Sequence, residues 1–467
     1  MAPDLQLTFD ALPAQVLRVL RTLGEAGHEA ALVGGVVRDR LRGAPLDRAD
    51  NWDAATSGRP EQVASLFADA TWENRFGTVT IVGEPSVEIT SYRTEGGYRD
   101  RRRPDQVRFG ATLAEDLSRR DFTINAIAWV PTDLDTGRGR VVDPHAGARD
   151  MEAGLLRTVG DPRERFTEDA LRLMRAARFA ARFELSVDPA AEAAIQELAP
   201  SVATVSAERV RDELLRMLDD AAPSRAIRLL ERFRLLPLIL PELAALRSVP
   251  QAKAVPGDAL DHTLAAVDAA PPDQTVRLAA LLHDIGKAST LADGHFIGHE
   301  RVGAELAAQA LRRLRMPAPV TAAVVPAIRH HMYAYGASWT DGAVRRFIRR
   351  VGQARMPLLF ALRRADNAAS GVGHAGDENQ AELERRIEAE LARSPDLLIH
   401  HRLAIDGNDV RRELGLEPGP RIGRILDRLT ELVLEDPDLN EPDTLLRLAR
   451  LGGAPTEGTR TDAEFDG

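Results

Sequence analysis

The feature that most constrains the fold is a change of hydrophobic pattern near residue 150 of the 467-residue chain. Strand-like alternation occurs before it: 77–83 (GTVTIVG) and 86–93 (SVEITSYR) are rich in β-branched residues, which predicts two paired strands. Apolar residues at helical spacing predict a helix over 12–28, and ALVGG (31–35) predicts a short strand entering a glycine turn. Beyond the change, helical spacing continues to the end. The expected fold class is α+β, with a small mixed-sheet head before a long, all-helical part.

Composition excludes several classes of protein. The chain has no cysteine, so disulfides, thiolate nucleophiles and cysteine-ligated zinc are impossible. It shows no apolar run near ~20 residues and no signal-peptide pattern at its start, so we expect a cytoplasmic protein without a membrane span. The net charge of −10 argues against nonspecific nucleic-acid binding, yet arginines gather at 93–120 and leave room for a local basic groove. Nearly all cationic residues are arginine; Lys253 and Lys287 are the lysines.

Carboxylates and glycines in the head suggest phosphate chemistry. Gly34-Gly35 after the strand would let backbone N–H groups approach a phosphate, although a tight strand-to-helix turn explains them equally. Phosphoryl transfer needs carboxylates for Mg²⁺. Asp53 is such a candidate; its same-face neighbour on a strand is Asn51, while Asp50 would point the opposite way. Glu88, on a paired strand, could add a carboxylate. The alternative is a solvated acidic loop.

Two later segments carry polar groups suited to a nucleotide. In RRDFTINA (119–126), the two arginines could clamp phosphate oxygens and Asp121 could accept a ribose hydroxyl; the alternative is a surface ion-pair cluster. Residues 165–183 read as one helix on which Asp169 and Arg172 lie three apart, offering an acceptor and donors to a base edge. Taken alone, such a pair more often forms an intrahelical salt bridge.

Together, six segments and the strand with Glu88 resemble the bacterial-type class II tRNA nucleotidyltransferase and poly(A) polymerase family. The segments occur in the family's order: LVGGVVRD (32–39), WDAATS (52–57), RRDFTINA (119–126), VVDPHAGARD (141–150), EDALRLMRAARFA (168–180) and ERVRDELLRML (208–218). The resemblance implies two-metal, template-independent nucleotide addition to RNA 3′ ends. It implies that Asp53 holds metal, that Asp169 and Arg172 read the edge of CTP or ATP, and that Glu208 and Arg209 support them. The remaining nucleotide-binding residues would be Gly34, Gly35, Arg38, Asp39, Arg120, Asp121, Asn125, Arg175 and Arg178.

The metal motif departs from the family pattern. The family has Asp-x-Asp, whereas this chain has Asn51-Trp52-Asp53, in a loop about three residues longer than usual. An asparagine offers an oxygen without negative charge, so Mg²⁺ should bind more weakly. Either Asp50 enters the site with help from Glu88, or transfer is reduced. We favour retained transfer, with Asp53, Asp50, Asn51 and Glu88 as the candidate catalytic set.

A second constellation lies in the helical part. A buried histidine taken alone is more often structural, but histidines with carboxylates suit a divalent metal. The ordered set His262, His283-Asp284 and Asp366 resembles the HD phosphohydrolase superfamily. The resemblance implies that these four ligate one metal, that His299 and His330 extend the site to two, and that phosphoesters at RNA ends are hydrolysed. The alternative is a degenerate domain kept for its shape.

The resemblance also divides the chain and leaves several activities open. The expected domains are a nucleotidyltransferase head (1–150), a helical neck (151–245), an HD metal domain (246–390) and a helical C-terminal region with an acidic disordered tail (391–467). Addition of CCA, of CC or A alone, of poly(A), or HD hydrolysis with an RNA-binding head remain candidates. The acidic end disfavours poly(A) synthesis, and the loop 93–107 favours CCA or A addition. We expect tRNA 3′ ends, CTP and ATP as partners, Mg²⁺ in the head, and Ni, Mn, Mg or Fe at the HD site.

Overall fold

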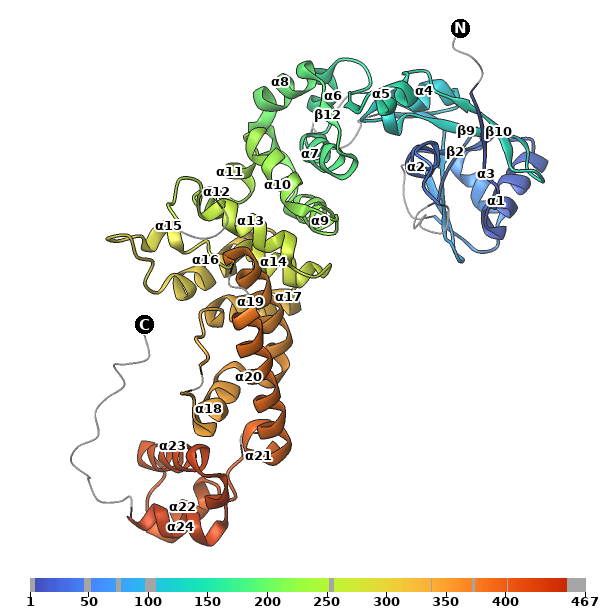
Figure 1. Ribbon diagram of the computed structural model, residues 1–467. Coiled ribbons are helices and arrows are strands. Elements are labelled where there is room, and N and C mark those ends of the chain that lie inside the picture. The colour runs from blue at the N-terminus through green and yellow to red at the C-terminus, as the bar shows by residue number, and fades with distance from the viewer. Residues whose placement is uncertain are drawn as a thin grey trace. The chain divides into compact units, whose positions relative to one another are not determined.

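The protein is described here from a computed structural model that covers residues 5–45, 52–72, 77–96, 106–251, 256–336, 338–371, 374–400 and 402–451. The chain forms two compact units that divide between Ile239 and Leu240; Figure 1 shows the strands and helices that make them up. The first holds the sheet and several helices, and the second is helical throughout its described residues. The expected α+β fold class is confirmed. The acidic tail lies outside the described residues, so its expected disorder stays a prediction.

The first unit begins with a mixed, eight-stranded sheet. Its strand order is β1-β10-β9-β2-β3-β6-β5-β4, in which β3 and β6 run parallel and the other neighbours antiparallel. The strands are β1 (Gln6–Thr8), β2 (Ala30–Val33), β3 (Trp52–Thr56), β4 (Ala70–Thr71), β5 (Thr78–Ile81), β6 (Val87–Ser91), β9 (Ala128–Asp133) and β10 (Arg138–Val142). A separate hairpin pairs β7 (Arg93–Gly96) with β8 (Gln106–Phe109).

Each face of the sheet has its own core, because successive strand residues point to opposite sides. On one face Trp52, Ala54, Val87 and Ile89 pack with apolar residues of the helices α1 to α3. On the other, Ala55 of β3 packs with residues of α4. The helices are α1 (Ala14–Glu25), α2 (Gly35–Leu41), α3 (Pro60–Leu66), α4 (Leu113–Ser118), the 3₁₀ turn η2 (Thr123–Asn125) and α5 (Gly147–Glu152). The alternation therefore puts Asp53 and Glu88 on the α4 side.

Helices complete the first unit, together with a two-stranded parallel ladder of β11 and β12. Its elements are β11 (Leu155–Leu156), α6 (Pro162–Glu168), α7 (Leu171–Phe183), β12 (Ser186–Val187), α8 (Pro189–Leu198), η3 (Ala199–Thr204), α9 (Ala207–Leu218), α10 (Pro223–Arg232) and α11 (Leu236–Ile239). We call α6 to α9 the neck helices. α7 packs between α9 and α10.

The prediction of a single helix over residues 165–183 was wrong. Two helices form instead: α6 ends at Glu168 and α7 begins at Leu171. Asp169 between them has extended backbone, with φ −146° and ψ 105°, and its carboxylate accepts a hydrogen bond from the N–H of Leu171. An aspartate side chain competes in this way with the helical backbone. Asp169 and Arg172 are therefore not neighbours on one helix.

The regular elements described in the second unit are all helices. Four of them, α13, α14, α17 and α19, pack together, and α16 packs on α17. The helices are α12 (Pro241–Ala244), α13 (Ala259–Ala269), α14 (Gln274–Leu282), α15 (Lys287–Thr290), α16 (His299–Arg313), α17 (Ala318–His330), α18 (Asp341–Val351), η4 (Gln353–Arg355), α19 (Met356–Ser370), α20 (His374–Arg393), α21 (Pro395–Leu398), α22 (Gly407–Leu414), α23 (Pro420–Glu435), η5 (Pro437–Leu439) and α24 (Pro442–Leu451). A search of the described helices finds none long and apolar enough to cross a bilayer.

Candidate nucleotide cleft and metal centre

A cleft of about 1160 Å³ lies in the first unit, between the head sheet and the neck helices. Every described residue that the sequence predicted to bind the nucleotide or the metal of the head lines it, as does Arg209, one of the two expected supporting residues. These are Gly34, Gly35, Arg38, Asp39, Asp53, Glu88, Arg120, Asp121, Asn125, Asp169, Arg172, Arg175 and Arg178. Asp50 and Asn51 lie outside the described residues, so their expected roles stay predictions.

The carboxylates of Asp53 and Glu88 lie side by side at the head end of the cleft. The two residues are direct partners in the parallel β3–β6 ladder, so their side chains leave the same face of the sheet. Burial raises the pKa of Asp53, the Arg120 guanidinium lowers it, and the Glu88 carboxylate raises it. A cation beside Asp53 would offset both its burial and the repulsion from the Glu88 carboxylate, which is exposed.

Gly34 is required at the turn before α2. Its φ is +68°, and a Cβ there would lie 3.0 Å from Nη1 of Arg120 and 3.9 Å from Oδ2 of Asp53. Any side chain would therefore be strained and would press on the Arg120 guanidinium. The glycine lets the backbone approach both charged groups.

A buried carboxylate that the sequence did not indicate holds the two arginines of RRDFTINA. Asp116 is completely buried, and its Oδ1 lies 2.8 Å from Nη2 of Arg119 while its Oδ2 lies 3.7 Å from Nη2 of Arg120. The buried Nε of Arg120 has no hydrogen-bond partner in the structure. The available signal was the spacing, since a carboxylate three and four positions before two arginines suits one helix face.

Asp121 lies at the centre of a network below the cleft surface. It accepts hydrogen bonds from Nε of Arg175 at 2.7 Å, from Nδ2 of Asn125 at 3.1 Å and from the N–H of Phe122 at 2.9 Å. Oδ1 of Asn125 in turn accepts from Nη1 of Arg38 at 2.6 Å. Burial would raise the pKa of Asp121, but Arg175, Asn125 and Arg172 together lower it to about 2. This geometry gives Asp121 a role in orienting Arg175 and Asn125.

The lowered pKa predicts how Asp121 contributes to stability. A carboxyl whose folded pKa is below its unfolded value stabilises the fold above the unfolded pKa and loses this contribution as pH falls through the folded pKa. Asp121→Asn should therefore cost on the order of 2 kcal/mol at pH 7, and this difference should shrink between about pH 5 and pH 2. Urea denaturation followed by the fluorescence of Trp52 and Trp129, both buried in the head, measures it.

Two outcomes bear on that prediction. In an Arg175→Gln background the pH dependence of the Asp121→Asn effect should shrink, because the main opposing charge is gone. A difference in unfolding free energy that stayed constant from pH 7 to pH 2.5 would contradict the prediction.

The expected base-reading residues, Asp169 and Arg172, are held by separate partners and not by each other. Asp169 forms a two-pronged ion pair with Arg209 of α9, with Nη1–Oδ1 at 3.1 Å and Nη2–Oδ2 at 2.7 Å. Arg172 donates to Glu168 and to the carbonyls of Arg165 and Arg119. Both side chains still line the cleft. The support expected from Arg209 therefore has a geometric basis, whereas Glu208 is exposed on the same helix and does not line the cleft.

Two aromatic rings of α7 were missed by the sequence analysis. Phe179 and Phe183 stack with centroids 6.0 Å apart and an interplanar angle of 10°. The Arg38 guanidinium lies 4.2 Å from the Phe183 ring, and that of Arg178 lies 4.2 Å from the Phe179 ring. Completely buried Glu213 of α9 accepts from Nε of Arg178. The rings and the carboxylate fix the arginines of the cleft wall in place.

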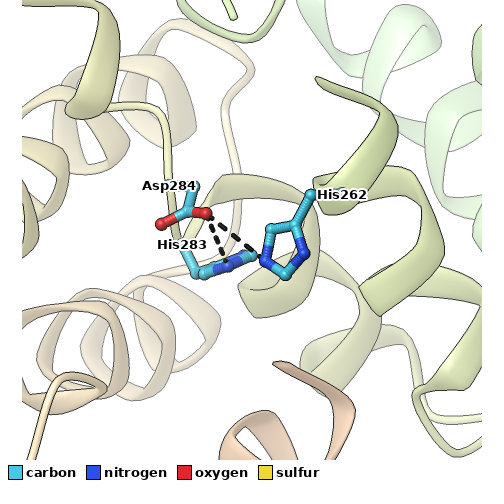
Figure 2. A group of neighbouring side chains, drawn as sticks. All are labelled: His262, His283 and Asp284. Carbon is cyan, nitrogen blue, oxygen red and sulfur yellow. Dashed lines mark ion pairs between the residues drawn. The ribbon is translucent and has the colours of Figure 1, made fainter. Parts of the chain in front are cut away.

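A second site lies in the second unit, where histidines and carboxylates from α13, α14, α16, α17 and α19 meet. Figure 2 shows the imidazoles of His262 and His283 turned toward the Asp284 carboxylate. Nε2 of His283 lies 3.1 Å, and Nε2 of His262 3.6 Å, from Oδ2 of Asp284. Asp366 faces the same imidazoles, with its Oδ1 3.0 Å from Nε2 of His262. The four residues expected to form one ligand set are therefore adjacent.

The second half of the site corrects one prediction. His331, not His330, faces the other Asp284 oxygen: Nε2 of His331 lies 3.8 Å and Nε2 of His299 3.4 Å from Oδ1. His331 is 1% exposed, whereas His330 is only half-buried. Consecutive helical residues point about 100° apart, so one of two adjacent histidines at the end of α17 can face the pocket. Sequence spacing did not distinguish them.

The histidines are oriented as metal ligands usually are. Nδ1 of His283, His299 and His331 lies within 2.6–2.8 Å of the backbone carbonyls of Ala280, Phe296 and Ile328, respectively. These bonds fix the tautomer and leave Nε2 as the electron-pair donor. The three Nε2 atoms are buried without a hydrogen bond. In the absence of a metal, Nε2 can carry a proton instead: burial would raise the pKa of Asp284, but the facing imidazoles, His283 first, then hold it well below its usual range.

The donor set therefore fits divalent cations. Two groups, His262–His283–Asp284 and Asp284–His299–His331, each bring their ligand atoms within 4.8 Å of one another. Asp284 belongs to both groups and offers a different oxygen to each. Imidazole and carboxylate ligands suit first-row transition metals. Divalent cations would be held by His262 and His283 with one oxygen of Asp284, and by His299 and His331 with the other.

Comparison with known proteins gives matches over both units. The chain matches the Poly A polymerase head domain over residues 30–157, the probable RNA and SrmB-binding site of polymerase A over 184–246, and the HD domain over 261–370. It is 33% identical over 453 residues to a CCA-adding enzyme of Lactiplantibacillus plantarum, covering 93% of this chain and 95% of the relative. The chain belongs to the tRNA nucleotidyltransferase and poly(A) polymerase family.

Other matches place this nucleotidyltransferase among relatives of differing specificity. It is 34% identical over 423 residues to an A-adding tRNA nucleotidyltransferase of Deinococcus radiodurans, covering 86% of this chain and 91% of the relative. A CCA-adding enzyme of Lactobacillus helveticus is 46% identical over 217 residues, which cover 45% of this chain and 52% of the relative. That match spans only about half the length of the relative.

The division of the chain into four domains remains a prediction.

A solved structure has a similar fold. The Bacillus stearothermophilus CCA-adding enzyme in complex with CTP has a TM-score of 0.68 and 26% identity, and the alignment covers 94% of this nucleotidyltransferase and 96% of that chain. Enzymes of the family use divalent metals. The cleft and the histidine cluster therefore lie within a fold that this chain shares with that solved enzyme along almost its whole length.

Proposed function

We propose that this protein adds the CCA end to tRNA, using CTP and ATP, without a nucleic-acid template. The observation that carries the proposal is the single cleft on which Asp53 and Glu88 of the head converge with Asp169 and the arginines of the neck. The full-length similarity to CCA-adding enzymes and the fold shared with one that was solved with CTP support the same activity. A cytoplasmic location is part of this proposal.

The residues of the cleft divide the work. Asp53 and Glu88 would hold Mg²⁺, which when bound neutralises charge on the reacting phosphate and the attacking 3′ oxygen. Arg120, Arg175 and Arg178 would bind phosphate oxygens. Asp169, fixed by Arg209, would accept a hydrogen bond from the exocyclic amino group that both cytosine and adenine carry. Transfer then depends mainly on positioning and charge neutralisation.

Addition of adenosine alone is the alternative supported by an observation, because an A-adding enzyme is as similar to this chain over most of its length. The cleft residues described above suit either nucleotide. Incorporation of labelled CTP and ATP, with Mg²⁺, into tRNAs that end before CCA, after C and after CC distinguishes the two. Stepwise addition of C, C and A supports the proposal. Addition of A alone, or of long A tails, overturns it in favour of the alternative or of a poly(A) polymerase, and no incorporation leaves an RNA-binding head.

We also propose that the histidine cluster of the second unit hydrolyses phosphoesters at RNA ends. The supporting observation is the pair of ligand groups that share Asp284, with every ligand residue buried. Divalent cations bound there, among Ni, Mn, Mg or Fe, would activate water and polarise the phosphate. The protein itself supplies the Asp284 carboxylate and the fixed imidazole orientations. Release of phosphate from RNA with a 3′-terminal phosphate, dependent on added metal, tests this proposal.

A further inference from the structure

Lys287 lies inside the histidine cluster, although a lysine is not among the residues expected to ligate a metal there. The side chain is 5% exposed, and its Nζ lies 2.6 Å from Oδ2 of Asp284 and 2.8 Å from Oε1 of Gln251. It also lies 5.4 Å from the ring centroid of Phe296. The ammonium is thus buried against the carboxylate that both ligand groups share.

The chemical identity of this residue is informative in this chain. Only two of the 61 lysines and arginines are lysines, so arginine is the default cationic residue here. An ammonium is a compact point charge with three donors on a flexible stem, whereas a guanidinium is a broad, rigid fork. The space beside the Asp284 carboxylate therefore suits a small cation such as an ammonium group. A divalent metal ion is also a small cation.

The lysine and the expected metal use the same oxygen. Oδ2 of Asp284 faces His283 at 3.1 Å and His262 at 3.6 Å, and this is also the oxygen that binds Nζ of Lys287. Oδ1 instead faces His299 and His331. A dication held by His262, His283 and Oδ2 would lie within a few ångström of the ammonium, and like charges at that distance repel.

We propose that Lys287 is a built-in competitor for the metal seat formed by His262, His283 and Oδ2 of Asp284. It neutralises Asp284 in the metal-free protein and opposes binding of a dication on this side of the carboxylate. This inference rests on the proposed metal site. It predicts that replacing Lys287 strengthens metal binding. An ordinary supporting role predicts the opposite, because removing a residue that merely orients a ligand weakens metal binding roughly 10- to 100-fold.

Titration of the full-length protein with Co²⁺ alone tests the proposal. Equilibrium dialysis measures the bound Co²⁺, and the same titration in an Asp53→Asn background, which lacks the head carboxylate, identifies the cobalt that the histidine cluster binds. Lys287→Met and Lys287→Gln should both bind Co²⁺ roughly tenfold more tightly than the unchanged protein. Lys287→Arg, which keeps the charge, should not. The metal-free Met and Gln variants should melt at a lower temperature, and Co²⁺ should raise their melting temperature by more.

The results separate this inference from the site on which it rests. Tighter binding in both neutral variants supports it; equal or weaker binding overturns it and leaves the metal site intact. If the unchanged protein and all variants bind no Co²⁺, both the metal site and the inference are wrong. If Lys287→Met does not fold, as judged by circular dichroism, Lys287→Gln decides, since its amide can still bond to Gln251.

Discussion

Asp53→Asn should reduce incorporation of both CTP and ATP by on the order of a thousandfold, while tRNA binding changes little. The substitution keeps the shape of the side chain but removes the negative charge beside Glu88, to which Asp53 is paired across β3 and β6. Because Asn51 already lacks a charge, a second asparagine would leave the motif without a carboxylate at either position. Single-turnover incorporation at saturating Mg²⁺ measures the loss, and filter binding measures tRNA affinity.

A matched control is Asp69→Asn in the same domain. Asp69 pairs with Arg18 on the surface and does not line the cleft, so its replacement should leave incorporation within about twofold. Equal loss for CTP and ATP is expected, since Asp53 lies on the head sheet, whereas the expected base-reading residues belong to the neck helices and the turn between them. Incorporation that survived Asp53→Asn within tenfold would mean that other carboxylates hold the metal.

Asp284→Asn should abolish metal-dependent hydrolysis of RNA 3′-phosphates, again by on the order of a thousandfold, without reducing nucleotide incorporation. The Asp284 carboxylate belongs to both ligand groups. Asparagine replaces its two charged oxygens with one neutral oxygen. Phosphate release and metal content, the latter by atomic emission after dialysis, measure the two consequences. After dialysis, Asp284→Asn should retain less than half of the metal that the unchanged protein retains at this site.

Asp293→Asn provides the comparison for that result. Asp293 is exposed in the segment between α15 and α16 and has φ +50°, a backbone conformation that asparagine accepts readily. Neither hydrolysis nor metal content should change. Hydrolysis that persisted in Asp284→Asn, and disappeared in Asp53→Asn, would instead assign it to the head.

The sequence predicted local features whose physical basis is local. Alternation located β5 and β6, and strand parity placed Asp53 and Glu88 on one face once their pairing was known. The break at Asp169 was missed because the apolar spacing of α6 and α7 continues across it, while the side chain bonds to the backbone at Leu171. The choice between His330 and His331 depended on where α17 ends, to within one residue.

Residue patterns alone did not show which distant segments contact each other, although the family resemblance indicated Arg209 as a support of Asp169. Arg209 reaches Asp169 forty positions earlier, and Glu213 reaches Arg178 thirty-five positions earlier. Their pairing depends on how α9 packs on α7, which periodicity does not define. Family resemblance located the residues that face the cleft, whereas the buried carboxylates behind them needed the folded chain.

Acidic partners of the cleft arginines change how these arginines respond when a triphosphate binds. Arg119, Arg175, Arg178 and Arg209 each have an acidic partner already in place: Asp116, Asp121, Glu213 and Asp169. Because these acidic partners balance the charge of the arginines, few counterions from solution bind there. Few are therefore released when a nucleotide binds. Because the side chains are already immobilised, little of their rotational freedom is lost at that step. The cost of ordering this cleft is met when the protein folds.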